Sequence, residues 1–138
     1  SRLKQTREIV VSAYFRVETG APADLRQTAR RSLHYRKTTQ PLAMPSAGCV
    51  FQNPPATVPL PDSVPRSAGA LVDRAGLKGY RVGGARISEK HANFIVNDGN
   101  ATAADIRALV ETAREAVRAT FGAVLLDEIV YLGNFEHG

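Results

Sequence analysis

The sequence has a single cysteine, Cys49, among 138 residues, and it has no long run of apolar residues. One cysteine cannot form an intramolecular disulfide, so a reducing cytoplasm is the expected compartment. The Cys and His residues do not have the spacing of a metal site, and no metal is expected. A membrane-spanning helix needs about 20 consecutive apolar residues, and no run approaches that length. The length suits one domain that buries a core without disulfides or metals.

Positive charge is concentrated at the start of the chain. Residues 1–40 carry nine Lys and Arg against three acidic residues, whereas residues 41–138 carry nine against ten. A basic patch of this kind can bind nucleic acid or another polyanion, or it can be a solvated face. Aromatic residues that could stack on bases are few there, namely Tyr14, Phe15 and Tyr35. A non-enzymatic basic module therefore remains an alternative function.

The apolar pattern predicts both helices and strands. Alternation over residues 9–17 predicts a strand, and Pro22 begins a basic helix that should end before Gln40. Capping signals at Ser67 and Thr102 predict two more helices. Further strands are expected at residues 49–51, 77–82, 85–87, 94–96 and 124–132. The predicted class is α+β, with helices packed on a small mixed sheet and preceded by the strand and the basic helix.

The residues that could perform chemistry concentrate in the segment Pro45–Pro54, which reads PSAGCVFQNP. Gly48 lacks the Cβ that would keep another molecule away from the backbone, and Asn53 offers both a donor and acceptors. Taken alone, a cysteine in such a proline-rich corner is more often a buried structural residue. A cysteine hydrolase is disfavoured because nothing in the sequence places His91 beside Cys49.

The same segment resembles the PSAGSxFKNP motif of UDP-N-acetylenolpyruvoylglucosamine reductases. Further matches follow in the same order, with GLKG at residues 76–79, GGA at residues 83–85 and SEKHANFIVN at residues 88–97. The resemblance implies a C-terminal substrate-binding domain at residues 41–138. Residues 1–40 fit it more loosely, as the end of the flavin-binding part and a connecting helix.

The resemblance implies an FAD-dependent oxidoreductase that uses NADPH to reduce the enolpyruvyl ether of a UDP-sugar in peptidoglycan precursor synthesis. The family's glycine-rich flavin-binding segments are absent from the sequence. We therefore expect a fragment that is inactive alone, with FAD bound mainly by a segment or chain that carries the flavin-binding half. The expected ligand is the UDP-sugar substrate, and neither nucleic acid nor a membrane is an expected partner.

Two catalytic roles follow from the resemblance. Cys49 stands where the family has its proton donor, usually a serine, and a thiol with a pKa near 8.5 is a far stronger acid than an alcohol. Glu128 matches the family's catalytic glutamate and would position the acid or stabilise the intermediate. Without the resemblance, a carboxylate at this place is more often a surface acid at the end of a strand.

Four residues are expected on the substrate side: Asn53, Lys78, His91 and Gln52. Lys78 suits a diphosphate because its ammonium group is a point charge. Gln52 replaces a lysine of the family motif, which removes one cation near the substrate. Val130 replaces the arginine that follows the catalytic glutamate by two residues, so the sequence leaves open how that glutamate is held.

Overall fold

The structure is a computed structural model that describes residues 9–133, and the chain divides into two compact units between Ser32 and Leu33. The first unit contains an extended segment before helix α1 (Pro22–Thr39) and the first turns of that helix. The helix begins at Pro22 and ends before Gln40, as the sequence predicts. None of its residues is buried.

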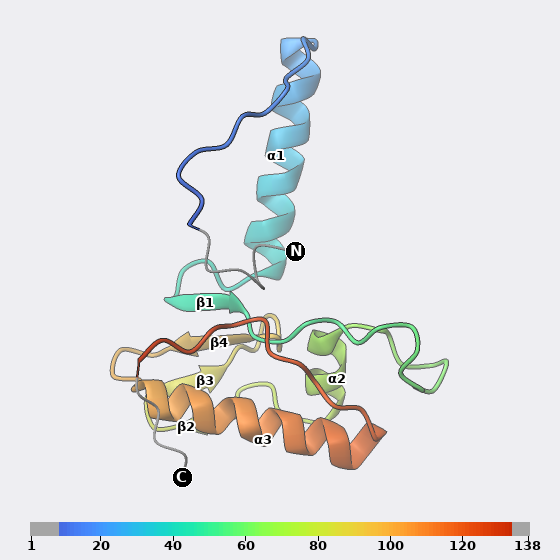
Figure 1. Ribbon diagram of the computed structural model, residues 1–138, viewed down its shortest axis with the longest axis vertical. Helices are drawn as coiled ribbons and strands as arrows, with labels where there is room; N and C mark the ends of the chain where they lie inside the picture. The colour runs from blue at the N-terminus through green and yellow to red at the C-terminus, as the bar shows by residue number, and fades with distance from the viewer. Residues whose placement is uncertain (1–8, 134–138) are drawn as a thin grey trace. The chain divides into compact units, whose positions relative to one another are not determined.

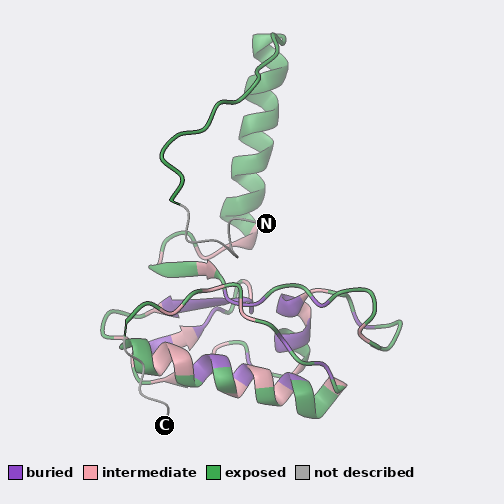
Figure 2. Ribbon diagram, viewed as in Figure 1, coloured by how far each residue is buried: buried purple, intermediate pink, exposed green. Residues whose placement is uncertain are grey.

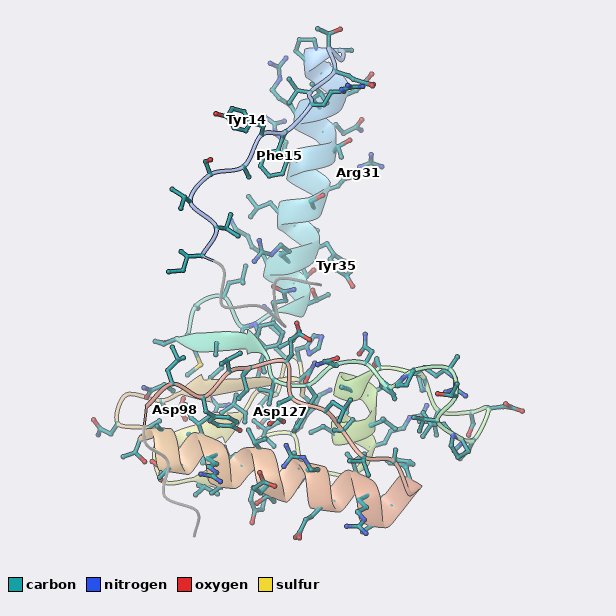
Figure 3. All side chains as sticks on the ribbon, in the orientation of Figure 1. Tyr14, Phe15, Arg31, Tyr35, Asp98 and Asp127 are labelled. Carbon is teal, nitrogen blue, oxygen red and sulfur yellow. The ribbon has the colours of Figure 1, made fainter. Side chains whose placement is uncertain are left out.

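The predicted strand at residues 9–17 is wrong. This segment has no strand pairing among the described residues, and the side chains of Val11 and Phe15 are 93% and 84% exposed. Tyr14, labelled with Phe15 in Figure 3, is 99% exposed. Alternation of apolar residues makes a segment suitable for a sheet, but a strand forms only where a neighbour supplies hydrogen bonds.

The second unit is built on a four-stranded sheet in the order β1-β4-β3-β2. The strands are β1 (Ser46–Cys49), β2 (Arg81–Val82), β3 (Ala85–Ile87) and β4 (Phe94–Asn97). The α+β class is confirmed, but all three pairings are antiparallel, so the sheet is not mixed. β2 and β3 are joined by the two residues Gly83 and Gly84, and β3 and β4 by the loop at residues 88–93. Short connections of this kind give antiparallel neighbours.

Three predicted strands differ from the observed ones. The strand predicted at residues 77–82 is reduced to β2, the one predicted at residues 49–51 lies earlier as β1, and the one predicted at residues 124–132 forms no ladder. β1 ends at Cys49, and the next pairing residue, Phe51, forms an isolated bridge with Asp127. That bridge is the only strand-like pairing of the predicted strand at residues 124–132 among the residues described. The chain after Cys49 changes its partner from β4 to this late segment, so a continuous ladder does not form on either side.

The two predicted helices of this unit are confirmed, as α2 (Ala68–Arg74) and α3 (Ala103–Phe121). The Ser67 side chain accepts a hydrogen bond from the Ala70 amide, which caps α2. Thr102 and Asp105 form a reciprocal capping box at the start of α3. Local side-chain bonds of this kind satisfy the amides that the first turn of a helix leaves unpaired.

The hydrophobic core lies between the sheet, α2 and α3. Figure 1 shows α3 along the β2–β3 side of the sheet, and Figure 2 shows burial concentrated on β4, α2 and one side of α3. Leu109, Val110 and Val117 of α3 are fully buried, and each such side chain stabilises the fold by roughly 1.5–3 kcal/mol. Within the described part of the chain, no helix is long and apolar enough to cross a membrane.

Candidate functional site

A β-bulge aims Cys49 out of the sheet. Ser46 pairs with Val96 and Cys49 pairs with Phe94, so three steps along β1 oppose two along β4. Gly48 lies inside this bulge with φ +89°, a conformation that L side chains rarely adopt. Bulges re-aim side chains near active sites, and the Cys49 side chain is exposed here. Glycine is therefore required before Cys49 by the backbone conformation of the bulge, and not by a neighbouring atom that a Cβ would meet.

Asn93 clamps the chain just after Cys49. Its side-chain oxygen accepts a hydrogen bond from the Phe51 amide at 2.9 Å, and its side-chain nitrogen donates to the Phe51 carbonyl at 2.9 Å. The Asn93 carbonyl also accepts from the Val50 amide at 2.8 Å. Asn93 is 3% exposed, and a buried amide with both ends bonded holds its partner segment in one conformation.

Glu128 reaches the same place through the backbone. The Glu128 amide donates to the Val50 carbonyl at 2.7 Å, and the Gln52 amide donates to the Leu126 carbonyl at 2.8 Å. The Gln52 side chain adds a hydrogen bond from Nε2 to the Asp127 carbonyl at 2.9 Å. The structure therefore brings Cys49 and Glu128 together, and it uses Gln52 to hold the segment that carries Glu128.

Arg114 of α3 anchors that segment from its other side. Its Nε donates to the Leu125 carbonyl at 3.2 Å, and a terminal nitrogen bonds the Asp127 carboxylate at 2.6 Å. Its other terminal nitrogen pairs with Glu111. Asp127, labelled in Figure 3, lies directly before Glu128 in the segment that follows α3. Arg114 thus holds the glutamate's segment in a chain where Val130 replaces the family arginine.

The environment of Cys49 favours the thiol over the thiolate. Although Cys49 is exposed, partial burial raises its pKa, a hydrogen bond with Asn93 lowers it, and the negative charge of Glu128 raises it again, with a net shift upward. Desolvation and a neighbouring carboxylate both penalise a second negative charge. A thiol in this setting carries its proton at neutral pH.

Lys78 and His91 line a second feature, a pocket of about 240 Å³ at the start of α2. The pocket is lined by Ser67, Gly69, Ala70, Asp73, Lys78, Lys90, His91 and Ala92. Lys78 forms an ion pair with Asp73 at 2.6 Å. Lys90 is exposed and adds a further cation to the lining, so the pocket suits an anion.

The His91 ring is held in place on several sides. Phe94 meets it edge-on with 5.0 Å between ring centroids, and a Cβ at Gly69 would lie 2.9 Å from its Cε1 atom. Its Nδ1 accepts a hydrogen bond from the Asn93 amide at 3.2 Å. Burial, and then the charge of Lys78, lower the pKa of His91. A neutral ring whose Nδ1 accepts carries its proton on Nε2.

Asn53 connects the two parts of the site. Its side-chain oxygen accepts a hydrogen bond from the amide of Ala68, the first residue of α2, at 3.0 Å. Ala68 lies between Ser67 and Gly69, which both line the pocket of Lys78. The residue that was expected to contact substrate therefore also fixes the start of this helix.

A pocket of about 560 Å³ lies elsewhere in the second unit and contains none of the six predicted site residues. Lys37, Arg86 and Lys90 contribute cations to it, over apolar side chains such as Leu42 and Val96. Its size alone does not make it the active site, because neither Cys49 nor Glu128 lines it. The residues described also contain no group of three or more His, Cys, Asp and Glu that could hold a metal ion.

Comparison with known proteins identifies the family. Residues 40–132 match the family model described as UDP-N-acetylenolpyruvoylglucosamine reductase, C-terminal domain. The chain belongs to this family. A UDP-N-acetylenolpyruvoylglucosamine reductase from Heliobacterium modesticaldum is 42% identical over 134 residues, which cover 97% of this chain and 40% of the relative. One from Chloroherpeton thalassium is 47% identical over 115 residues, 83% of this chain and 36% of that relative.

A solved structure of the family has the same fold. The crystal structure of the UDP-N-acetylenolpyruvylglucosamine reductase from Thermus caldophilus is 41% identical, with a TM-score of 0.55 over 75% of this chain and 32% of that protein. The chain thus spans 40% or less of each of these three reductases. The α+β domain described above is therefore one part of the reductases that it resembles.

Two residues of this reductase domain were missed by sequence reasoning. Asn93 lies in the SEKHANFIVN match but carried no predicted role, and Arg114 lies on α3 outside every motif. Both act on partners far along the chain, since Asn93 bonds Phe51 and Arg114 bonds Asp127. The only sequence signal for Asn93 was its place beside His91, and Arg114 had none.

Proposed function

We propose that this chain is the substrate-binding portion of a reductase that converts UDP-N-acetylglucosamine enolpyruvate to UDP-N-acetylmuramate with NADPH, a cytoplasmic step of peptidoglycan precursor synthesis. Membership of the family supports this function. The observation that carries it is the meeting of the segments of Cys49 and Glu128, where the Glu128 amide donates to the Val50 carbonyl at 2.7 Å. We assign substrate binding to residues 41–138 and the connection to the flavin-binding part to residues 1–40.

The flavin belongs on another part of the enzyme in this proposal. The pocket at Lys78 measures about 240 Å³, which is below the roughly 300–1,000 Å³ of sites that enclose a whole ligand of cofactor size. Its cationic lining fits a diphosphate better than a flavin ring, so we assign none of its residues to FAD. When bound by a segment or chain with the flavin-binding half, FAD recharged by NADPH supplies hydride.

Cys49 is the proposed proton donor. Saturating the enolpyruvyl double bond requires a hydride at the methylene carbon and a proton at the adjacent carbon, where negative charge develops next to the carboxylate. The S–H bond of Cys49 breaks, the proton goes to that carbon, and a thiolate remains. The raised pKa of Cys49 suits this role, because a general acid must hold its proton at the working pH.

Glu128 helps to return Cys49 to its protonated form after this step. Its negative charge disfavours the thiolate that proton donation leaves behind. The thiolate therefore takes up a proton from solvent before the next turnover. The hydrogen bonds of Val50, Gln52 and Arg114 to this segment keep the backbone of Glu128 beside the residues that follow Cys49.

The pocket of Lys78 and His91 is the proposed site for the diphosphate of the substrate. Lys78 offers a positive charge, and the neutral ring of His91 offers the Nε2 proton. Lys78 pairs with Asp73, so a diphosphate would compete with this carboxylate. Asn53, four residues after Cys49, accepts a hydrogen bond from Ala68 and so links this segment to the start of α2 beside the pocket.

The test uses the enzyme that contains this chain together with its flavin-binding part. In Cys49→Ala, reduction of the flavin by NADPH should be unchanged, whereas its reoxidation by the enolpyruvyl substrate should slow by about 10²–10⁴-fold, the usual effect of a general acid. Cys49→Ser should recover much of that rate, because the family's usual donor is an alcohol. Stopped-flow absorbance separates the two half-reactions. Reoxidation of Cys49→Ala at the parent rate would remove Cys49 from the mechanism.

The alternative of a basic module that binds nucleic acid has no observation in its favour. Strongly salt-dependent binding to random DNA would support it, whereas selective binding of UDP-sugars supports the reductase. A direct comparison by calorimetry needs only the purified chain and the two ligands.

A further inference from the structure

Asn93 makes four hydrogen bonds that reach both parts of the proposed site. Its side chain bonds the Phe51 amide and the Phe51 carbonyl, each at 2.9 Å. Its carbonyl accepts from the Val50 amide at 2.8 Å, and its amide donates to Nδ1 of His91 at 3.2 Å. The first three bonds hold the residues directly after Cys49, and the fourth holds a ring that lines the pocket of Lys78.

Asn93 is buried, so it is suited to holding neighbouring residues in place and not to contacting a ligand at the surface. It directly precedes β4, where Phe94 pairs with Cys49, and it is 3% exposed. Because its side-chain oxygen and nitrogen are both bonded to Phe51, the amide cannot turn without leaving a buried polar group unpaired. The segment that carries Cys49 and the ring of His91 therefore share one rigid neighbour.

We propose that Asn93 is the positioning residue of this site, which sets Cys49 through its side chain and the proton-bearing nitrogen of His91 through its backbone amide. This inference rests on the proposed function, because it fixes the spacing between the proton donor and the group that binds the diphosphate. A substrate is then selected by the separation of its reducible carbon from its phosphates. The charged neighbours are Glu128 at Cys49 and Lys78 at His91.

The only cysteine of the chain makes the first part directly measurable. The rate of alkylation of Cys49 by iodoacetamide, followed against pH in the purified chain, gives the pKa of the thiol as its midpoint. In Asn93→Ala the midpoint should move up, because the side chain of Asn93 lowers that pKa and holds the residues after Cys49 in place. In Asn93→Asp it should move up further, because a carboxylate is added beside the thiol.

Asn97 provides a matched control at the other end of β4. Its side-chain oxygen accepts from the amides of Gly99 and Ala101, at 2.8 and 3.1 Å. Asn97→Ala therefore also removes a side chain that makes two bonds to the backbone. Both bonds lie in the turn after β4, so the alkylation midpoint of Cys49 should stay at the parent value. Circular dichroism confirms that each variant is folded before its thiol is titrated.

The second part is tested on the parent chain by NMR of ¹⁵N-labelled histidine. His91 should carry its proton on Nε2 at neutral pH, and a proton on Nδ1 would overturn this part. An unchanged thiol midpoint in folded Asn93→Ala, or a shift equal to that of Asn97→Ala, would overturn the first part. If Asn93→Ala does not fold, Asn93→Ser carries the same test, because its shorter side chain gives up the bonds to Phe51 without adding a charge.

These outcomes are separable from the fate of the proposed function. Thiol titration and histidine NMR require neither flavin nor turnover, so they judge Asn93 alone. Full activity of Cys49→Ala in the enzyme would reject the proton-donor assignment and leave the Asn93 result intact. In the enzyme, Asn93→Ala should lower kcat by about 10-fold or more, on the scale of a misplaced catalytic group, whereas Asn97→Ala should not.

Discussion

Substitution of Arg114 by glutamine should loosen the segment that carries Glu128 and thereby change the pKa of Cys49, although Arg114 bonds Leu125 and Asp127 and not Cys49. Arg114 bonds the Leu125 carbonyl at 3.2 Å and the Asp127 carboxylate at 2.6 Å. Its side chain is 23% exposed and that of Asp127 is 27% exposed. The ion pair is therefore only partly screened by solvent.

The expected loss of stability follows from these contacts. A partly screened ion pair contributes about 1 kcal/mol, and the hydrogen bond from a charged donor to the Leu125 carbonyl contributes about 1 kcal/mol more. The pair with Glu111, which is 54% exposed, adds about 0.3–0.5 kcal/mol. Arg114→Gln should thus lower the free energy of unfolding by about 2 kcal/mol, as measured by urea denaturation.

The thiol of Cys49 gives a second measurement. Glu128 raises the pKa of Cys49, so a loosened Glu128 segment should move the alkylation midpoint of Cys49 to lower pH. Glu128→Gln should move it in the same direction, because it removes the negative charge that raises the pKa of Cys49. Asp127→Asn should cost about 1 kcal/mol and should be less than additive with Arg114→Gln.

Arg118, exposed on the same helix, is the control. Arg118→Gln should change stability by no more than about 0.5 kcal/mol and leave the thiol unaffected. If Arg114→Gln behaves like Arg118→Gln in both measurements, the anchoring of the Glu128 segment by α3 is refuted.

The remaining predictions concern the bulge and the pocket. Gly48→Ala should lower the free energy of unfolding in urea by about 1–2 kcal/mol, because a residue with a Cβ is strained at φ +89°. An added Cβ meets no atom within 4 Å, so the backbone alone causes this loss, and an unchanged urea midpoint would contradict the bulge. Gly69→Ala places a Cβ 2.9 Å from Cε1 of His91 and should shift the histidine NMR signals, while identical spectra would rule out that contact. Folding lowers the pKa of His91. The contribution of the neutral ring to folding stability is therefore fully present above the pKa of the unfolded chain, about 6.5, and is lost as pH falls through the lower pKa of the folded protein. His91→Gln should remove that part of the pH dependence of thermal unfolding, and an equal slope in both proteins would count against it. Lys78→Ala should weaken binding of the UDP-sugar product to the full enzyme by about 1–3 kcal/mol in calorimetry, whereas Asp73→Asn should strengthen it; equal affinities would take both residues out of the site.

The helices were predictable from the sequence because their signals are local. Pro22 begins α1, Ser67 caps α2, and Thr102 with Asp105 caps α3 through bonds between residues three positions apart. Each signal acts within one turn, so the residues nearby suffice to predict where a helix starts. The family motifs are equally local, and short stretches of sequence suffice to single out Cys49 and Lys78.

Only the tertiary structure decided which extended segments pair and what holds the proposed acid. The segments at residues 9–17 and 124–132 have strand-like patterns, yet the first has no partner strand among the described residues and the second makes one bridge. Asn93 reaches Phe51 across 42 positions of sequence, and Arg114 reaches Asp127 across the end of its helix. A strand or a buried polar side chain is stable only when distant residues supply its hydrogen bonds. The sequence by itself therefore named the residues with chemistry, while the fold determined which of them meet.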